Sequence, residues 1–205
     1  MTPKLIAIAG GTGAGKSSLA FALMDAYPDK ISIVHLDDYQ WHGVNRSNVP
    51  IYHGMRNWDH PDAIDWVSLI GDLEKLKAGK SITILSKNER LVPRTKKRLF
   101  DDPPRQRILM EIVPMPIIIL EGYISLWHPR ILSIIEYAIF LDAGHDLRAS
   151  RRTGFLNPEY EKKVLIPAHE SYVEPTKQFA DVVIDVDTMS FDDVIKTVER
   201  DLFDR

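Results

Sequence analysis

Residues 10–17 read Gly-Gly-Thr-Gly-Ala-Gly-Lys-Ser and match the phosphate-binding pattern G-x-x-x-x-G-K-[ST] at every fixed position. Glycines in such a loop let successive backbone N–H groups point into one concavity. The lysine brings a full positive charge to the β- and γ-phosphates, and the last hydroxyl is a ligand for Mg²⁺. The pattern predicts a nucleotide-phosphate site formed by Gly10, Gly11, Thr12, Gly13, Ala14, Gly15, Lys16, Ser17 and Ser18.

The flanking residues decide between a phosphate site and an ordinary glycine-rich turn. Residues 4–9 are an apolar run of strand length, and residues 18–24 have the composition of a helix. A helix that begins at the loop adds partial positive charge and unpaired N–H donors where an anion would bind. The strand–loop–helix context therefore favours a phosphate site over a turn without a ligand.

Carboxylates follow two further apolar runs of strand length. Asp37 and Asp38 follow one of them, and Glu121 follows the other. Ligands of open parallel sheets bind beyond the carboxyl ends of the strands, so we expect these side chains near the phosphate loop. Glu121 is a candidate Mg²⁺ ligand opposite Ser17, with a strand-end cap as the alternative. Asp37 is a candidate proton acceptor or metal-shell residue, whereas Asp38 is more typical of a turn or cap.

The order of the remaining patterns predicts how these residues are held. Runs of strand length alternate with stretches of helical spacing along the whole chain, which favours an α/β fold with a parallel sheet. We expect the three-layer α/β/α fold of P-loop NTPases, with a five-stranded parallel sheet and an inserted basic hairpin. The expected strands are 4–9, 32–36, 117–120, 137–141 and 180–186, with a further short β-rich piece at 81–85.

Residues 87–107 differ from the rest of the chain in charge. They hold eight Lys or Arg and three acids, a net +5, so the other residues carry −8 of the total charge of −3. The stretch is also rich in proline, which predicts a hairpin or long loop at about 86–107 that stands off the main sheet. A solvated hairpin is the simpler interpretation. The alternative is that cations such as Arg90 bind an anionic substrate.

Length and composition limit the classes of protein that need to be considered. A chain of 205 residues suits one domain, spanning 1–205, with a full core. Its net charge of −3 gives no reason to expect a nucleic-acid or membrane partner. It has no cysteine, which excludes disulfides, thiolate metal sites and cysteine nucleophiles. No apolar run approaches the ~18 residues of a membrane span, and we expect a cytoplasmic protein.

Several classes of phosphate-loop protein have signatures that this sequence lacks. Neither Asn-Lys-x-Asp nor Asp-x-x-Gly occurs, which argues against a GTPase, and the absence of Leu-Ser-Gly-Gly-Gln argues against a transporter ATPase. The short chain also leaves little room for the additional parts of a motor. A small-molecule kinase is therefore the favoured class.

Six blocks of the chain resemble the uridine kinase family, within the wider group of P-loop kinases that contains phosphoribulokinases and nicotinamide riboside kinases. The blocks come in the family's order and span nearly the whole chain, and Asn-Trp-Asp-His-Pro is the most specific after the phosphate loop. The matching residues are 10–17, Leu-Asp-Asp-Tyr at 36–39, Asn-Trp-Asp-His-Pro-Asp-Ala at 57–63, Ile-Leu-Glu-Gly at 119–122, Asp-Leu-Arg-x-x-Arg-Arg at 146–152, and Pro-Thr-Lys-Gln-Phe-Ala-Asp-Val-Val-Ile at 175–184.

The resemblance implies an ATP-dependent kinase that uses Mg²⁺ and phosphorylates a hydroxyl of a small nucleoside-, riboside- or sugar-like acceptor. It implies that Asp37 is the catalytic base, and that Asp59 accepts hydrogen bonds from sugar hydroxyls. Lys16 and the lid arginines Arg148, Arg151 and Arg152 are implied to neutralise phosphate charge, with Arg151 on the nucleotide; the alternative is a solvated helix face. Tyr39 and Trp58 are candidates for the wall of the acceptor pocket, although aromatic side chains are more often in the core. The resemblance is also compatible with a homo-oligomer.

The chain departs from the family pattern on the acceptor side. The region that reads the uracil or cytosine ring in the family carries Tyr and His, whereas residues 86–90 here read Ser-Lys-Asn-Glu-Arg. The lid that the resemblance implies, at about 148–160, is short. The hairpin at about 86–107 is long and basic. These departures leave open a nicotinamide riboside kinase-like enzyme or another kinase with an anionic acceptor. A different class, a nucleotide-binding regulatory protein without phosphotransferase activity, also remains open.

Overall fold

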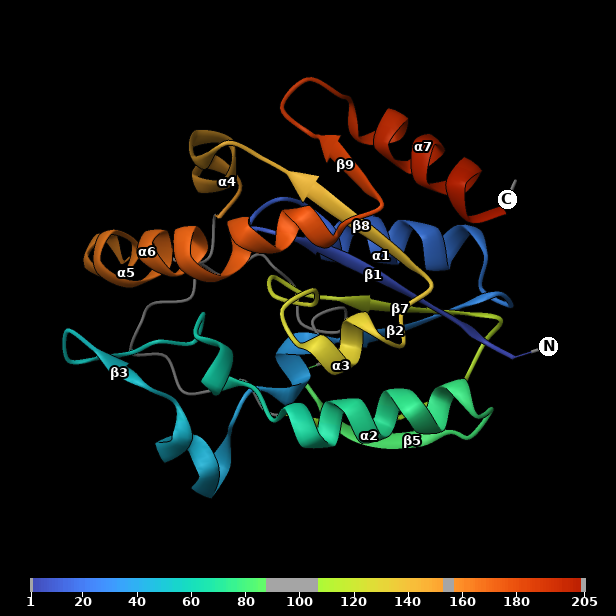
Figure 1. The fold of residues 1–205 in the computed structure, drawn as a ribbon, viewed down its shortest axis with the longest axis horizontal. Helices are drawn as coiled ribbons and strands as arrows, with labels where there is room; N and C mark the ends of the chain where they lie inside the picture. Colours follow the sequence, from blue (N-terminus) through green and yellow to red (C-terminus); the bar gives the residue numbers. More distant parts are fainter. Residues whose placement is uncertain (1, 88–106, 153–156, 204–205) are drawn as a thin grey trace.

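The structure is a computed structural model that describes residues 2–87, 107–152 and 157–203. At its centre is a sheet of five parallel strands, β1 (Lys4–Gly10), β2 (Ile31–His35), β7 (Ile117–Glu121), β8 (Tyr137–Asp142) and β9 (Val182–Asp185). The strand order is β2-β7-β1-β8-β9, which places the strand before the phosphate loop in the middle (Figure 1). The predicted α/β fold with a five-stranded parallel sheet is confirmed.

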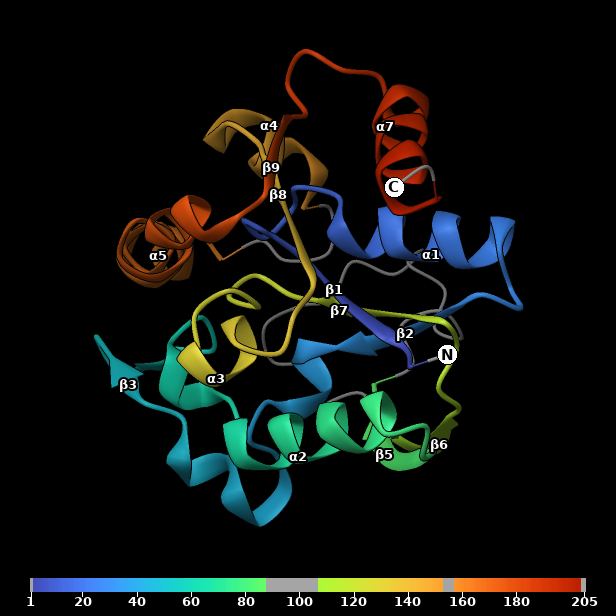
Figure 2. The same ribbon diagram turned by 45° about the vertical axis from the view of Figure 1, so that its right-hand side comes forward.

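The central strands are buried on both faces, which explains their continuous apolar sequences. Alternate residues of β1 point to opposite sides: Leu5 and Ala7 belong to one core cluster, and Ile6 and Ile8 to the other. Helices α1 (Lys16–Ala26) and α7 (Phe191–Phe203) cover the second cluster, and they lie side by side in Figure 2. Helices α2 (Trp66–Lys77) and α3 (Pro129–Leu132) cover the first cluster. The layers are therefore helix, sheet and helix.

Helix α2 begins after a capping aspartate and ends just before a glycine. The Asp65 carboxylate accepts a hydrogen bond from the N–H of Ser68 at 3.1 Å, which caps the first turn. At the other end, Gly79 has a φ of 76°, the left-handed conformation that terminates many helices. Because η1 (Leu36–Tyr39) packs against α2, the helix helps to hold the short turn that carries Asp37 and Asp38.

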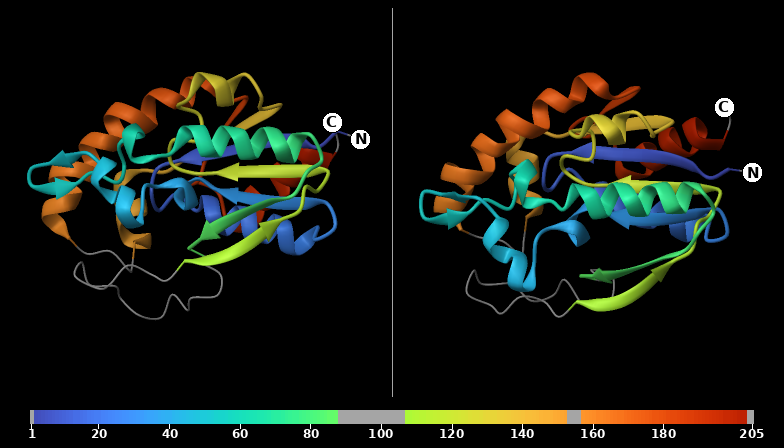
Figure 3. Two further views of the ribbon diagram at one scale, coloured as in Figure 1. Left: turned by 90° about the horizontal axis from the view of Figure 1, so that it is seen from below. Right: turned by 60° about the horizontal axis from the view of Figure 1, so that its bottom comes forward.

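Two small antiparallel ribbons accompany the main sheet. Strands β5 (Ile82–Ser86) and β6 (Ile108–Ile112) pair beyond β2, and they form the stem of the predicted basic hairpin (Figure 3). Strand β6 was not predicted, because it is largely exposed and lacks the alternation of apolar and polar residues that indicates a strand. The second ribbon, β3 (Ile51–Tyr52) and β4 (Met55–Arg56), follows the 3₁₀ helix η2 (Gly43–Asn48).

A helical arm, residues 158–179, crosses the same side of the sheet as α2 and α3. The arm is helical throughout, but only its short pieces α5 (Pro158–Tyr160) and α6 (Ile166–Ala168) are α-helical. They alternate with the π-helical turns η4 (Glu161–Leu165) and η5 (His169–Val173), and the arm ends in the 3₁₀ helix η6 (Glu174–Phe179). Wide π turns occur preferentially at functional sites. The arm follows α4 (His145–Arg151), which carries two of the three lid arginines.

Within the part of the chain that the structure describes, no helix combines the length and the apolar character needed to cross a bilayer. The longest helix, α7, has 13 residues and is charged on one side.

The contact between Gly122 and Leu36 makes a first prediction about the fold. A Cβ atom at Gly122 would lie 2.3 Å from the Cβ of Leu36, the residue before Asp37. We expect Gly122→Ala to lower the free energy of unfolding by about 1–3 kcal/mol, because the added methyl overpacks the core. The measurement is urea unfolding.

Gly71→Ala is the matched control. Gly71 lies inside α2, and a Cβ atom there meets no other atom within 4 Å. We expect this variant to be more stable than wild type by about 0.5–1 kcal/mol, because alanine favours the helix. A Gly122→Ala protein as stable as the wild type would show that the contact with Leu36 is not a tight one.

Candidate active site

A cavity of about 190 Å³ opens at the carboxyl ends of β1, β2 and β7. The phosphate loop forms one wall, the turn after β2 forms a second, and the end of β5 closes a third side. The residues that line the cavity are Thr12, Gly13, Lys16, Ser17, His35, Asp37, Asp38, Ser86, Lys87, Glu121, Gly122 and Tyr123. The predicted loop and the predicted carboxylates Asp37 and Glu121 therefore meet in one place.

The parallel register of the sheet brings these residues together. Glu121 at the end of β7 is the register partner of His35 on β2 and of Ile8 on β1. The phosphate loop leaves β1 two residues later. As a result, the last residues of three neighbouring strands face the same space, as expected for the ligand edge of an α/β sheet.

The phosphate loop has the backbone that its glycines permit. Gly13 has a φ of 92°, and a Cβ atom there would lie 2.5 Å from the carbonyl oxygen of Arg148. Glycine is therefore required both by the conformation and by the close approach of α4. Helix α1 begins at Lys16 immediately after the loop, so its unpaired N–H groups face the cavity. This arrangement is a cradle for an anion.

Lys16 is buried, with 8% of its surface exposed, and its ammonium donates to the Gly11 carbonyl at 3.1 Å. Burial lowers the pKa of Lys16, and the negative charges of Glu121 and Asp37 oppose this effect. The site therefore surrounds one buried cation with carboxylates. An anionic ligand such as a phosphate would give this lysine a further partner of opposite charge.

Ser17 and Glu121 are neighbours in the lining of the cavity. The Ser17 hydroxyl donates to Glu121 Oε1 at 3.2 Å, and Nδ1 of His35 lies 2.6 Å from the same oxygen. A hydroxyl and a carboxylate are hard oxygen ligands of the kind that Mg²⁺ prefers, and Mg²⁺ typically takes few protein ligands alongside phosphate oxygens and water. The residues present therefore fit the predicted metal role, with His35 orienting the Glu121 carboxylate.

Asp37 lines the cavity, and 42% of its side chain is exposed. Its Oδ2 atom lies 3.5 Å from Nζ of Lys87. Burial by itself raises the pKa of Asp37, but the positive charges of Lys87 and Lys16 outweigh it, so the pKa lies below its usual value. The carboxylate is therefore ionised at neutral pH and free to accept a proton.

Asp38 has a structural role, as expected for a turn residue. Its carboxylate accepts hydrogen bonds from the Ser86 hydroxyl at 2.8 Å and from the Lys87 N–H at 2.7 Å. The Arg107 guanidinium reinforces this junction, because it donates to the carbonyl groups of Asp38 and Leu85 at 2.6 and 2.8 Å. These bonds attach the stem of the basic hairpin to the turn that carries Asp37.

Asp59 lies near Asp37 and Lys16, on the loop before η3 (Pro61–Ala63). Desolvation raises the pKa of Asp59 to about 6, against a hydrogen bond from the Tyr160 hydroxyl that favours the ionised form. That bond is 2.8 Å long and comes from the helical arm. Asp59 is therefore held at the site in a state that titrates close to neutral pH.

The three lid arginines all contact the phosphate loop or its neighbours. Arg148 is buried and donates from Nε to the Ala143 carbonyl at 3.0 Å, beside Gly11. Arg152 and Arg151 donate to the carbonyl groups of Thr12 at 3.2 Å and Ala14 at 3.3 Å. The alternative of a solvated helix face does not hold for Arg148 and Arg152, since each is less than 9% exposed.

The structure describes two of the three other predicted acceptor contacts, Tyr39 and Trp58, but not Arg90. Tyr39 is 7% exposed, belongs to the core under α2, and donates from its hydroxyl to Asp72 at 3.0 Å. The Trp58 ring packs against the arm cluster that includes Tyr160, and Arg46 lies 5.4 Å from its centre. Arg90 falls in 88–106, outside the described residues, as does most of the basic segment.

Sequence reasoning missed four side chains of this site, namely His35, Lys87, Tyr123 and Tyr160. His35 ends a strand in register with Glu121, and this position relative to the strand end was a usable signal. Lys87 directly follows β5 and was counted only as one cation of the basic segment. Tyr160 is about 100 residues from Asp59 in sequence, so only the folded structure reveals the contact.

Comparison with known proteins supports the resemblance to the uridine kinase family that the sequence shows. Residues 5–154 match the model of the phosphoribulokinase / uridine kinase family. The chain is 32% identical to uridine kinase-like protein 3 of Arabidopsis thaliana, covering 89% of this chain and 39% of that protein. It is 28% identical to the uridine kinase of Bacillus mycoides, covering 89% of this chain and 85% of that protein. The chain thus spans about two fifths of the plant relative and most of the bacterial one.

Solved structures show the same fold at lower sequence identity. A possible uridine kinase from Bacillus stearothermophilus aligns with a TM-score of 0.62 and 18% identity, covering 90% of each chain. Shikimate kinase from Acinetobacter baumannii aligns with a TM-score of 0.50 and 12% identity, covering 99% of this chain and 94% of that one. The family match covers about three quarters of the sequence, and the fold and the loop agree with it. The chain belongs to the phosphoribulokinase / uridine kinase family of P-loop kinases.

Proposed function

We propose that this protein transfers the γ-phosphoryl group of ATP to a hydroxyl of a small nucleoside-, riboside- or sugar-like acceptor. The observation that carries the proposal is that Asp37, Lys16, Ser17 and Glu121 line one cavity at the end of the parallel sheet. Phosphoryl transfer requires positioning, charge neutralisation and a group that takes the hydroxyl proton. These four side chains supply those functions.

On the nucleotide side, the loop N–H groups and the start of α1 would bind the phosphate oxygens. Lys16 would contact the β- and γ-phosphates, and Arg148, Arg151 and Arg152 stand against the same loop to offset negative charge. Ser17 and Glu121 would hold Mg²⁺, which would supply positive charge to offset the negative charge of the transferred phosphoryl group.

On the acceptor side, Asp37 would take the proton from the attacking hydroxyl as the new O–P bond forms and the bond to the leaving ADP oxygen breaks. A carboxylate is a suitable base here because Lys87 and Lys16 keep it ionised. Asp59 would accept hydrogen bonds from further hydroxyls of the acceptor, since one carboxylate can bind two vicinal hydroxyl groups.

The contacts of Lys87 favour a neutral acceptor over an anionic one. The Lys87 ammonium lines the cavity, but it donates to Gln40 Oε1 at 2.7 Å and pairs with Asp37 at 3.5 Å. An anionic group would have to compete for this cation in a cavity that also contains Asp37, Asp38 and Glu121. We therefore infer a neutral polyol or riboside, with uridine as the first compound to test.

The experiment is an ADP-release assay with ATP and Mg²⁺ over nucleosides, nicotinamide riboside, sugars, and phosphorylated or carboxylated acids. We expect at least one neutral riboside to raise ADP release well above the rate without acceptor. Turnover only with anionic acceptors would overturn the choice of a neutral acceptor. Tight ATP binding with no acceptor-dependent turnover would favour a nucleotide-binding regulatory protein instead.

The two neighbouring aspartates after β2 allow a prediction that separates chemistry from stability. We expect Asp37→Asn to lower kcat by about 10²- to 10⁴-fold, because an amide cannot accept the proton. ATP binding should be retained. Steady-state kinetics and a nucleotide-binding titration measure the two effects.

Asp38→Asn is the matched comparison. It weakens the acceptor for Ser86 and Lys87, so we expect it to lower the free energy of unfolding by about 1–3 kcal/mol. Its kcat per folded molecule should fall far less than that of Asp37→Asn. Equal losses of kcat in the two variants would contradict the assignment of Asp37 as the base.

The pKa of Asp59, about 6, predicts how acceptor binding depends on pH. Its carboxyl group is ionised above this value and becomes protonated as the pH falls through it. Because the protonated form loses acceptor capacity, the acceptor KM should rise by about tenfold per pH unit below pH 6 and be flat above it. In Asp59→Asn, which does not titrate, KM should be high and should lose this dependence. A wild-type KM that is constant from pH 5 to 8 would contradict the role of Asp59.

A further inference from the structure

The Tyr160 hydroxyl makes two hydrogen bonds to the loop that carries Asp59. It donates to Asp59 Oδ2 at 2.8 Å and accepts from the Trp58 N–H at 3.1 Å. The tyrosine is 2% exposed, so both bonds are shielded from water. Among the residues that the structure describes, Tyr160 is the one whose side chain donates a hydrogen bond to the Asp59 carboxylate.

The peptide group between Trp58 and Asp59 is held by two further side chains. The Trp58 carbonyl accepts from the Tyr123 hydroxyl at 2.6 Å and from Gln40 Nε2 at 3.2 Å. The backbone of this loop therefore has several supports, whereas the carboxylate of Asp59 depends on Tyr160. Removing the Tyr160 hydroxyl should free the carboxylate and also remove the acceptor of the Trp58 N–H, while the bonds from Tyr123 and Gln40 keep the loop in place.

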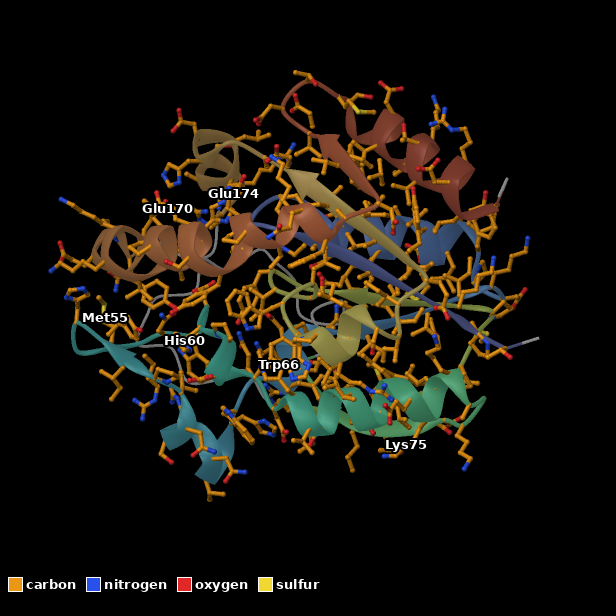
Figure 4. The ribbon with its side chains drawn as sticks, viewed as in Figure 1. Met55, His60, Trp66, Lys75, Glu170 and Glu174 are labelled. Carbon is orange, nitrogen blue, oxygen red and sulfur yellow. The ribbon has the colours of Figure 1, made fainter. Side chains whose placement is uncertain are left out.

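The helical arm holds Tyr160 against the rest of the site. Successive residues of a helix point in different directions, so Tyr160 and the next residue, Glu161, contact different neighbours. Glu161 pairs with Arg152, and Arg152 donates to the Thr12 carbonyl of the phosphate loop. Figure 4 shows Met55 and His60 beneath the arm that carries Glu170 and Glu174, and the Met55 side chain packs against the cluster around Tyr160. The arm is thus attached to the phosphate loop on one side and to the acceptor loop on the other.

We propose that Tyr160 is a positioning residue, which orients the Asp59 carboxylate for the hydroxyl groups of the acceptor. This inference rests on the proposed function, because it assumes that Asp59 binds the acceptor. The bond also favours the charged form of Asp59, since a hydroxyl donor stabilises a carboxylate more than a carboxylic acid. Tyr160 therefore affects acceptor binding through Asp59 and takes no part in the transfer of the phosphoryl group.

The other charged and titratable groups that face Asp59 stay in place when only this hydroxyl is removed. Asp37 raises the pKa of Asp59, Lys16 and Arg152 lower it, and Tyr123 lies close enough to be affected by its charge. With the Tyr160 bond gone, desolvation and Asp37 act with less opposition. The titration midpoint of Asp59 should then move upward from about 6.

The first experiment follows the Asp59 carboxyl carbon by NMR through a pH titration of the ligand-free protein, with Asp59→Asn for assignment. In Tyr160→Phe we expect the midpoint to rise by at least about half a pH unit, as for the loss of a hydrogen bond to a charged group. Incorporation of 3-fluorotyrosine at position 160, a stronger donor with the ring retained, should move the midpoint downward. An unchanged midpoint in both proteins would overturn the proposal. The titration can be done without knowing the acceptor.

Tyr137→Phe is the matched control for this titration. The Tyr137 hydroxyl also donates to a carboxylate, that of Asp201, at 2.8 Å. Tyr137 lies at the beginning of β8, at the opposite end of the strand from the site. Its variant loses a bond of the same kind, and we expect no movement of the Asp59 midpoint and no change in kinetics.

The second experiment measures kinetics with ATP and uridine, or with the riboside that supports turnover best. At pH 7 we expect Tyr160→Phe to raise the acceptor KM about five- to fiftyfold, as expected for the loss of a charge-assisted bond, with kcat within about threefold of wild type. The ATP KM should not change. A shifted midpoint with an unchanged acceptor KM would overturn the acceptor role of Tyr160. Failure of wild-type protein to phosphorylate any acceptor would refute the proposed function, and the NMR titration would still decide whether Tyr160 controls Asp59.

Discussion

The site depends on the parallel register between β1, β2 and β7. This register aligns His35 with Glu121 and brings both beside the end of β1, where the phosphate loop begins. A shift of one residue would turn Glu121 to the other face of the sheet, since side chains alternate along a strand. The buried apolar residues of β7 prevent such a shift, because both faces of that strand are covered by core clusters. The core therefore determines where the carboxylate of Glu121 lies.

The site that we propose has a nucleotide half and an acceptor half, and the two are attached to this frame in different ways. The nucleotide half is formed by one continuous segment, the loop and α1, and α4 can approach it closely because residues 11 and 13 are glycines. The acceptor half is assembled from the turn after β2, the end of β5, the loop at 57–60 and the helical arm. These pieces are joined by hydrogen bonds that Asp38 accepts from Ser86 and that Arg107 and Tyr160 donate.

Much of the frame could be predicted from sequence, because its signals are local. The glycine pattern at 10–17 and the apolar runs at 4–9 and 117–120 each depend on neighbouring residues, and the structure agrees with all of them. The acceptor half was less accessible. Tyr39 was a candidate for the pocket wall, with the core as the more common place for an aromatic ring, and its ring belongs to the core under α2. The contact of Tyr160 with Asp59 spans a sequence separation of 101 and leaves no local pattern.

The central claim is that the cavity between the phosphate loop and Asp37 performs phosphoryl transfer to a hydroxyl. The most direct measurement is ³¹P NMR of the wild-type protein with ATP, Mg²⁺ and a riboside acceptor. We predict that a phosphomonoester signal appears in equal amount to the ADP formed, and that the acceptor carbon bearing the new ester shows coupling to phosphorus. ADP accompanied only by inorganic phosphate, with every acceptor left unmodified, would contradict the account.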